Sequence, residues 1–244
     1  MVGRDWAEWV IQDGPSIVVD RAAAAVLVTA SSPLRVDALV HPYLAFPAAV
    51  SSYWAGRCSL HAGALAVDGK VWALVGQKEG GKSSTLGWFA QRGHSVVTDD
   101  LLIIDQGRAL AGPRCIDLRE EASRELGAGE ELGVIGMRTR WRVRLGPIPA
   151  CLPLAGWIFL SWADQLHVEP IPPGELLRRI FANRALSLIP PDPHVYLDLA
   201  ALPAWEVGRP RRLDALPEVS RRILDLIQWG SETATKTAMP SATG

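Results

Sequence analysis

Residues 76 to 83 form the pattern that most constrains the fold of this chain. They read Gly-Gln-Lys-Glu-Gly-Gly-Lys-Ser, a complete G-x-x-x-x-G-K-S phosphate-binding loop. An apolar run (71–75) precedes the loop, and a helix-compatible stretch (83–92) follows it. A glycine-rich turn between a strand and a helix N-terminus directs backbone N–H groups and the positive end of the helix dipole toward one point. The pattern therefore predicts an α/β fold that binds a nucleoside triphosphate at this turn.

The residues of the loop have separate predicted roles. Its main chain is expected to wrap around the phosphates, because glycines let a ligand approach the backbone closely. Lys82 is predicted to reach the β- and γ-phosphates, and the Ser83 hydroxyl is predicted to ligate Mg²⁺. A nucleoside triphosphate and Mg²⁺ are therefore the expected ligands of the loop. The predicted nucleotide-binding residues are Gly76, Gln77, Lys78, Glu79, Gly80, Gly81, Lys82, Ser83 and Ser84.

Composition and charge limit the class of protein. Apolar residues make up 48% of the chain and charged residues 21%, which is enough for a sizeable core. The net charge is −1 without a strongly basic block, so a nucleic-acid partner is not expected. No apolar run approaches the roughly 20 residues of a membrane-spanning helix, and the N-terminus lacks a signal-peptide pattern. Because the three cysteines fit neither a disulfide framework nor a metal spacing, we expect a cytoplasmic protein without a membrane partner.

The remaining patterns predict a mixed sheet with an N-terminal β layer. Three short apolar runs separated by turn residues predict the strands of this layer (9–11, 17–19 and 25–29). Asp68-Gly69 between two β runs is typical of a hairpin that leads into the loop. Further strands are expected at 94–98, 101–104, 138–145, 156–162 and 204–207, helices at 45–56, 116–126, 174–185 and 216–229, and a mobile loop at 127–133.

These elements predict three parts of the chain. Residues 1–57 are expected to form the β layer and a helix packed on the core. Residues 58–229 are expected to form the nucleotide-binding catalytic domain. Residues 230–244 are rich in Ser, Thr and Ala, and a disordered tail is predicted there.

Two adjacent acidic residues and a histidine are the candidate catalytic groups. Asp99 and Asp100 follow a predicted strand, and a phosphate loop needs a carboxylate on a neighbouring strand to hold Mg²⁺. The second carboxylate can act as general base toward the incoming nucleophile. We assign Asp99 to the base and Asp100, with Ser83, to the metal, although the sequence allows the reverse. His61, at the start of the hairpin, is predicted to lie near the γ-phosphate and pair with an Asp or a phosphoryl oxygen.

Three arginines alternate along the predicted strand 138–145. Arg140, Arg142 and Arg144 therefore share one face of that strand. They would either clamp phosphates or a peptide carboxylate, or form a solvated strand face. The sequence leaves both interpretations open.

The order of the motifs resembles that of a known family. L-H-x-G (60–63), the phosphate loop (76–83) and R-G-H-x-x-x-x-D-D (92–100) together resemble the catalytic domain of bacterial HPr kinase/phosphorylase, whose fold is similar to PEP carboxykinase. The resemblance covers about residues 58–105. It implies that Asp99, Asp100 and His61 are active-site groups beside Lys82 of the loop, with Asp99, His61 and Lys82 as the catalytic residues, and that the γ-phosphoryl group of ATP passes to a serine hydroxyl; Mg²⁺ is the implied cofactor.

The chain also departs from that family. It has no I-R-G-L-G-I-I-D signature, which accompanies HPr recognition and the reverse phosphorolytic reaction, and no N-terminal domain of the family's length. Its layout is similar to shorter HPr-kinase-related proteins of ribosomal-peptide maturation, including lasso peptide kinases, which phosphorylate a serine at or near the precursor's C-terminus. The implied partner is thus a peptide or protein bearing an acceptor serine, and a homo-oligomer stays open. The alternatives are a small-molecule kinase and a non-catalytic ATP-binding regulatory subunit.

Overall fold

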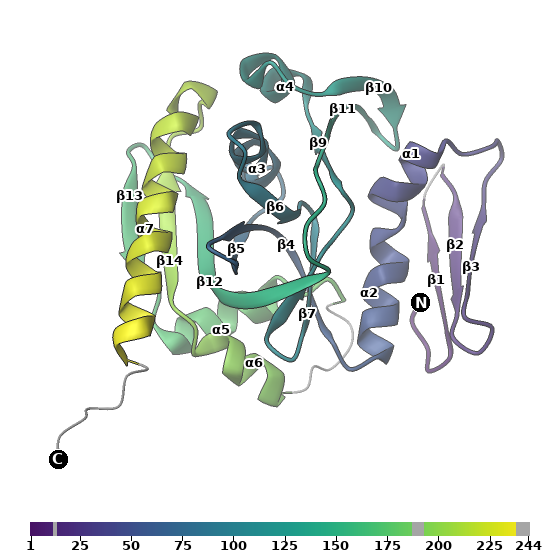
Figure 1. The fold of residues 1–244 in the computed structure, drawn as a ribbon. Coiled ribbons are helices and arrows are strands. Elements are labelled where there is room, and N and C mark those ends of the chain that lie inside the picture. Colours follow the sequence, from purple (N-terminus) through teal and green to yellow (C-terminus); the bar gives the residue numbers. More distant parts are fainter. Residues whose placement is uncertain (12–13, 187–192, 238–244) are drawn as a thin grey trace.

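A computed structural model describes residues 1–11, 14–186 and 193–237, with side chains described as far as residue 230. It is a mixed α/β structure in which a large mixed sheet carries helices, with two three-stranded sheets beside it (Figure 1). The predicted fold class is therefore confirmed at the level of a mixed α/β sheet.

The large sheet has the strand order β13-β14-β12-β5-β4-β7-β8, and β6 pairs with β4. Because β5, β12 and β14 are parallel, their carboxyl ends meet at one edge of the sheet. The predicted hairpin is confirmed: Asp68 and Gly69 join β4 to β5 with φ values of 50° and 73°, as a two-residue type I′ turn requires. The strands are β4 (Cys58–Val67), β5 (Lys70–Gly76), β6 (Ser95–Thr98), β7 (Leu101–Asp105), β8 (Arg108–Leu110), β12 (Cys151–Trp162), β13 (His167–Pro170) and β14 (Ala204–Arg209).

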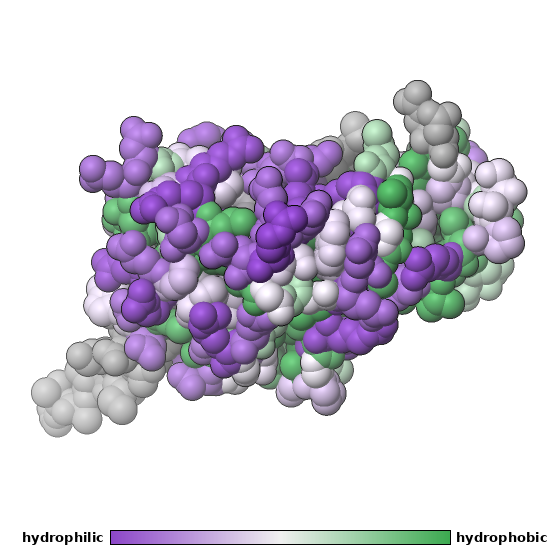
Figure 2. All heavy atoms as spheres, turned by 90° about the horizontal axis from the view of Figure 1, so that it is seen from above, coloured by the Kyte–Doolittle hydropathy of each residue, from purple (hydrophilic) through white to green (hydrophobic). Residues whose placement is uncertain are grey.

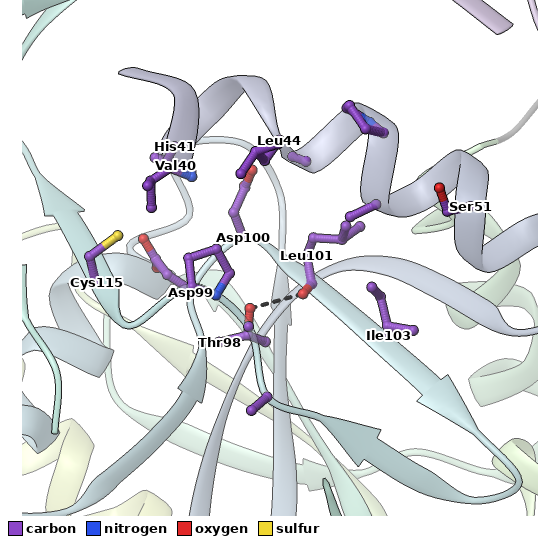
Figure 3. A pocket seen from close by; sticks show the side chains of 16 residues that line it. Val40, His41, Leu44, Ser51, Thr98, Asp99, Asp100, Leu101, Ile103 and Cys115 are labelled. Atoms are coloured by element: carbon purple, nitrogen blue, oxygen red, sulfur yellow. Dashed lines mark hydrogen bonds between the residues drawn. The ribbon is translucent and has the colours of Figure 1, made fainter. Parts of the chain in front are cut away.

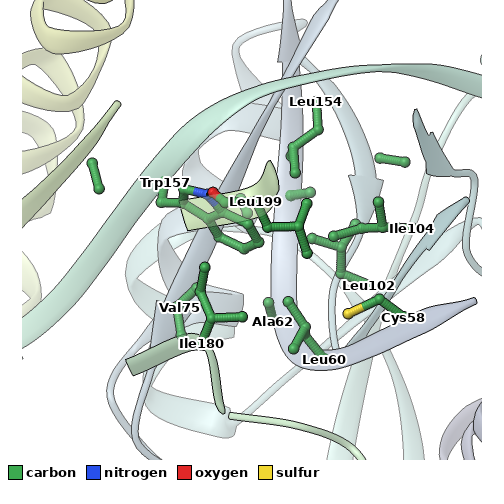
Figure 4. Close-up of a cluster of buried hydrophobic side chains, with 14 of the residues drawn as sticks. Cys58, Leu60, Ala62, Val75, Leu102, Ile104, Leu154, Trp157, Ile180 and Leu199 are labelled. Atoms are coloured by element: carbon green, nitrogen blue, oxygen red, sulfur yellow. The ribbon is translucent and has the colours of Figure 1, made fainter. Parts of the chain in front are cut away.

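Two hydrophobic clusters fill the space between this sheet and its helices. In one, Trp157 is fully buried among residues of the sheet, α5 and α6, and its indole Nε1 donates to the Leu199 carbonyl oxygen over 3.0 Å (Figure 4). In the other, Trp72 is buried against α7 and the Trp205 ring. Burying one such large side chain stabilises the fold by roughly 1.5–3 kcal/mol, so the clusters hold β5 and its loop rigidly in place. The helices are α3 (Lys82–Gln91), α5 (Pro173–Ala182), α6 (Pro193–Ala200) and α7 (Leu216–Thr237), with a short 3₁₀ turn η2 (Leu213–Ala215) before α7.

A small antiparallel sheet packs beside α3. It consists of β9 (Cys115–Leu118), β10 (Glu130–Ile135) and β11 (Arg138–Arg144), and α4 (Glu120–Leu126) connects β9 to β10.

Two sequence predictions are wrong in this region. Residues 116–126 are not one helix, because residues up to 118 belong to β9 and only the remainder forms α4. Residues 127–133 are not a mobile loop, because β10 begins at Glu130. The charged composition hid both strands. Asp117, which looked like a residue of a solvated helix, is buried between arginines of β11, and Gly133 lies at a β-bulge with φ 73°.

The N-terminal layer is an antiparallel sheet that packs on a helical segment. β1 (Trp6–Val10), β2 (Ser16–Asp20) and β3 (Ala25–Thr29) form the sheet, which lies beside α2 (Ala45–Trp54) (Figure 1). A short helix α1 (Val36–Ala38) and a π-helical turn η1 (Leu39–Tyr43) lead into α2. Large hydrophobic side chains of this layer are exposed, among them Trp6, Val10 and Leu27. Polar residues cover much of the molecular face that is seen in Figure 2.

The C-terminal helix is longer than the sequence predicts. α7 continues to Thr237, so the first residues of the predicted disordered tail (230–244) are helical. Residues 238–244 lie outside the described part of the chain, and the boundary between residues 57 and 58 stays a prediction. Among the described helices, none combines the length and apolar character needed to cross a membrane.

Candidate functional site

The phosphate loop lies where β5 ends and α3 begins. Gly81 caps α3 in the left-handed region (φ 76°), and Gly80 N–H donates to the Gln77 carbonyl oxygen over 2.9 Å. A side chain at Gly81 would overlap Arg209 and would also be strained by its positive φ. The loop therefore has the strand–turn–helix context and the glycine conformation that the motif predicts. Its backbone N–H groups at the start of a ten-residue helix suit a phosphate group.

Lys82 belongs to the phosphate loop, and its side chain is buried against the main chain at the start of that loop. Its Nζ atom donates to the carbonyl oxygens of Gly76 (2.7 Å) and Gln77 (3.2 Å), and it lies 3.4 Å from His61 Nε2. Burial lowers the pKa of Lys82, while the nearby charges of Asp100 and Asp99 act in the opposite direction. The ammonium group thus bonds to the first residues of the loop and lies beside His61, one of the predicted catalytic groups.

His61 connects Lys82 to Asp100. Its ring lies on β4, and its Nδ1 atom is 3.2 Å from Asp100 Oδ1. Burial lowers the pKa of His61, which favours the neutral ring at neutral pH. In the neutral ring that satisfies both neighbours, Nδ1–H donates to Asp100 and Nε2 accepts from Lys82. The predicted pairing of His61 with an aspartate is therefore present, and the partner is Asp100.

Asp99 precedes Asp100 in the turn between β6 and β7. Its carboxyl group lies beside the Ser83 side chain. Within the described part of the chain, its Oδ1 atom is buried and has no hydrogen-bond partner. Burial raises the pKa of Asp99 to about 7, while hydrogen bonding from Ser83 and from the Asp117 backbone acts to lower this pKa. A buried carboxylate oxygen without a donor, beside the hydroxyl of the loop serine, fits the oxygen-rich coordination that Mg²⁺ prefers.

The arginines of β11 do not reach the loop. Arg142 donates to both carboxylate oxygens of Asp117 (2.7 and 2.9 Å), and Arg140 donates to Asp117 over 3.3 Å. Arg142 also donates to Asp37 Oδ1 (3.1 Å) and to the His41 carbonyl oxygen (3.3 Å). Both interpretations of the alternating arginines are therefore wrong for Arg140 and Arg142. Both are buried partners of the internal carboxylate of Asp117, and Arg142 alone also bonds to the segment before α2.

One cation beside the loop was missed by the sequence analysis. Arg209 ends β14, and its Nη2 atom donates to the Gly80 carbonyl oxygen over 2.8 Å. Its guanidinium group stacks on Trp162, at the end of the adjacent strand β12. Burial lowers the pKa of Arg209 to about 10, and the described residues offer it no ion pair. Its place after a buried apolar strand was the available signal, because carboxyl ends of parallel strands meet at ligand sites.

A cavity of about 360 Å³ opens on the opposite side of the site, at the Asp pair. Its walls come from η1 and α2 on one side, including Leu44 and Ala48, and from β7 on the other, including Leu101. Figure 3 shows Asp99 and Asp100 at one end of this space, below the helical segment. No sequence signal pointed to this cavity, since its two walls are about fifty residues apart in the chain.

Comparison with known proteins finds a likeness among solved structures. No family model and no curated protein matches the chain. Among solved structures, the chain is similar to the Hpr(Ser) kinase/phosphatase from Coxiella burnetii, with 14% sequence identity and a TM-score of 0.33. The aligned region covers 70% of this chain and 97% of the other. An overlap this low is no evidence about function, so the proposal below depends on the site residues.

Proposed function

We propose that this protein is an ATP- and Mg²⁺-dependent phosphotransferase that transfers the γ-phosphoryl group to a serine hydroxyl of a peptide or protein. One observation carries the proposal: a hydrogen-bonded chain links Lys82 of the phosphate loop through His61 to Asp100. Nucleotide binding by itself needs the loop but has no use for a carboxylate–histidine pair at its end. The pair is therefore better explained by a reaction at the γ-phosphate than by a regulatory nucleotide site.

In this proposal the two aspartates exchange the roles first assigned to them. Asp99, whose buried Oδ1 atom has no hydrogen-bond partner among the described residues, would hold Mg²⁺ together with the Ser83 hydroxyl. Bound Mg²⁺ would neutralise part of the charge on the phosphate oxygens. Asp100 would accept the serine proton, and His61 would orient its carboxylate. The serine oxygen then bonds to the γ-phosphorus as the bond to the bridging oxygen of ADP breaks, and Lys82 stabilises charge on the leaving oxygens.

The acceptor is proposed to be a peptide. A ribosomally made precursor peptide of the lasso type is the specific form that the sequence resemblance implies. A phosphorylated small metabolite, or free phosphate without any phosphorylated acceptor, would instead support one of the two alternatives. Product analysis after incubation with γ-labelled ATP therefore separates the three functions.

Two aspartate variants test the assignment of roles. Asp100→Asn should lower kcat by about 10²–10⁴-fold and leave the Kd for Mg·ATP within about threefold, because it removes proton transfer only. Asp99→Asn should instead weaken Mg²⁺-dependent nucleotide binding, measured by calorimetry. Asp105→Asn is the matched control. Asp105 ends β7, the strand that follows the turn, and its carboxylate pairs with Arg57 at the surface. Label transfer that survives Asp100→Asn would contradict the assignment of the base.

A further inference from the structure

The charged side chains that line the cavity lie at one end of it. Asp99 and Asp100 lie at that end, close to His41, whereas Leu44, Leu101 and Ile103 are among the apolar residues of the remaining walls (Figure 3). A volume of about 360 Å³ is at the small end of the range for ligand pockets, about 300–1,000 Å³. The space is therefore suited to a side chain or a short segment of chain rather than to a large ligand.

The charges around the cavity select against an anionic occupant. No lysine or arginine is among its described lining residues, and two carboxylates are. The nearby guanidinium groups of Arg140 and Arg142 are already bound to Asp117. Burial lowers the pKa of His41, so this ring offers little positive charge at neutral pH. An acidic group in this space would lose its water without gaining a partner.

The cavity also lies on the side of Lys82 where an acceptor must approach. Asp100 reaches Lys82 through His61, and Asp100 lines the cavity. Arg209 and Trp162 lie beside Gly80 and Gly81 at the ends of β14 and β12. In the sheet order, these two strands and the Asp pair are on opposite sides of β5. A hydroxyl entering from the cavity therefore meets the proposed base first.

Building on the proposed function, we propose that this cavity is the acceptor subsite. It takes a serine whose neighbouring side chain is apolar and uncharged. The serine hydroxyl lies at Asp100, and the apolar neighbour lies between α2 and β7, in contact with Leu44 and Leu101. The N-terminal helical segment is then the part of the chain that determines substrate specificity.

A set of capped peptides tests this subsite. The probes are acetyl-Leu-Ser-Leu-amide, acetyl-Gln-Ser-Gln-amide, acetyl-Glu-Ser-Glu-amide and acetyl-Ser-amide, each incubated with the full chain, Mg²⁺ and γ-labelled ATP. The Leu peptide should have a kcat/KM at least tenfold above each of the others. Equal labelling of the Gln or Glu peptide, or of acetyl-Ser-amide, would overturn the subsite while leaving the serine kinase function in place. ATP consumption without label on any peptide would overturn both.

Two substitutions of Ala48, which lines the cavity, locate the preference. Ala48→Phe fills the space and should lower kcat/KM for the Leu peptide at least tenfold, with the Kd for Mg·ATP unchanged. Ala48→Lys places a cation there and should shift the ratio of Glu to Leu peptide at least tenfold toward Glu. Ala55→Phe and Ala55→Lys are matched controls at the exposed end of α2. If the Ala48 variants behave like these controls, with circular dichroism showing that all are folded, the subsite is disproved.

Discussion

Asp99 and Asp100 are adjacent in the chain, yet their side chains have different surroundings. Asp99 is buried beside Ser83, whereas Asp100 is partly exposed and pairs with His61. The pattern of two carboxylates after a strand predicts that both are functional, but it does not say which faces which group. The packing around the turn between β6 and β7 decides this, because it buries Asp99 beside Ser83 and leaves Asp100 next to His61.

The raised pKa of Asp99 predicts that the ionised carboxylate lowers the stability of the protein when no Mg²⁺ is bound. The pKa is about 7 in the folded protein against 3.8 as the ordinary value, so the folded state binds the proton more tightly. This contribution to stability is present below about pH 4 and is lost as the pH rises toward 7. Asp99→Asn should therefore stabilise the protein at pH 8, by up to about 4 kcal/mol. The measurement is chemical unfolding at pH 8 and pH 4.5 in EDTA.

Asp100→Asn is the comparison for that experiment, since this carboxylate is partly exposed and bonded to His61. The gain for Asp99→Asn should shrink markedly between pH 8 and pH 4.5. A gain that is the same at both pH values would show that the burial of charge is not its cause. Loss of stability at pH 8 would contradict the prediction outright.

At the scale of elements, one buried ion pair joins three parts of the chain. Arg142 of β11 binds Asp117 of β9 and, through Asp37 and the His41 carbonyl oxygen, the segment that leads into α2. The side chains of Arg142 and Asp117 are 3% and 0% exposed, so neither charge has water as an alternative partner. This pair therefore fixes the wall of the cavity to the small sheet beside α3.

Arg142→Met should destabilise the protein by about 3–5 kcal/mol, because it leaves the Asp117 charge buried with only Arg140 as an arginine partner. Arg144→Met is the matched control on the same strand, since Arg144 pairs with Glu130 in an exposed position. That change should alter stability by less than about 1 kcal/mol. Urea unfolding of the two variants checks the difference. Equal losses of stability would show that the buried ion pair contributes no more than the exposed one.

At the scale of the whole molecule, the proposed reaction places the nucleotide and the acceptor on opposite sides of β5. Arg209 and Trp162 lie on the β12–β14 side of the phosphate loop, and His61 with the Asp pair lies on the β4–β6 side. Arg209 is a buried charge without an ion pair in the described part of the chain, which suits it to a phosphate group of the nucleotide.

Arg209→Met should raise the KM for ATP at least tenfold and leave the KM for an acceptor peptide within about twofold. The physical reason is that the lost cation is on the donor side only. Arg211→Met serves as control, because this exposed arginine also faces Trp162 but does not bond to the loop. Steady-state kinetics with each substrate varied in turn give both constants. A larger effect on the peptide than on ATP would contradict the separation of the two sides.

The sequence by itself determined the local features of this protein. The phosphate loop, the hairpin through Asp68-Gly69 and most strands and helices follow from short-range patterns, because glycine conformations and apolar periodicity act over a few residues. The patterns failed for β9, where burial of Asp117 by Arg140 and Arg142 reverses what a charged segment normally indicates. They also failed for β10, where a glycine-rich stretch is a strand with a β-bulge at Gly133. A buried ion pair depends on a partner more than twenty residues away, and no local pattern contains it.

Only the tertiary structure decided which groups meet. Arg209 reaches Gly80 across 129 residues of sequence, and the cavity forms between α2 and β7. Lys82, His61 and Asp100 come from three different elements and touch only because β4 lies between β5 and β6. Hydrogen bonds and desolvation act over a few ångströms in space, regardless of separation along the chain. The motif alone therefore predicted that the loop binds phosphate. Which side chains lie next to the loop, and so which role each can have, depended on the packing of the sheet.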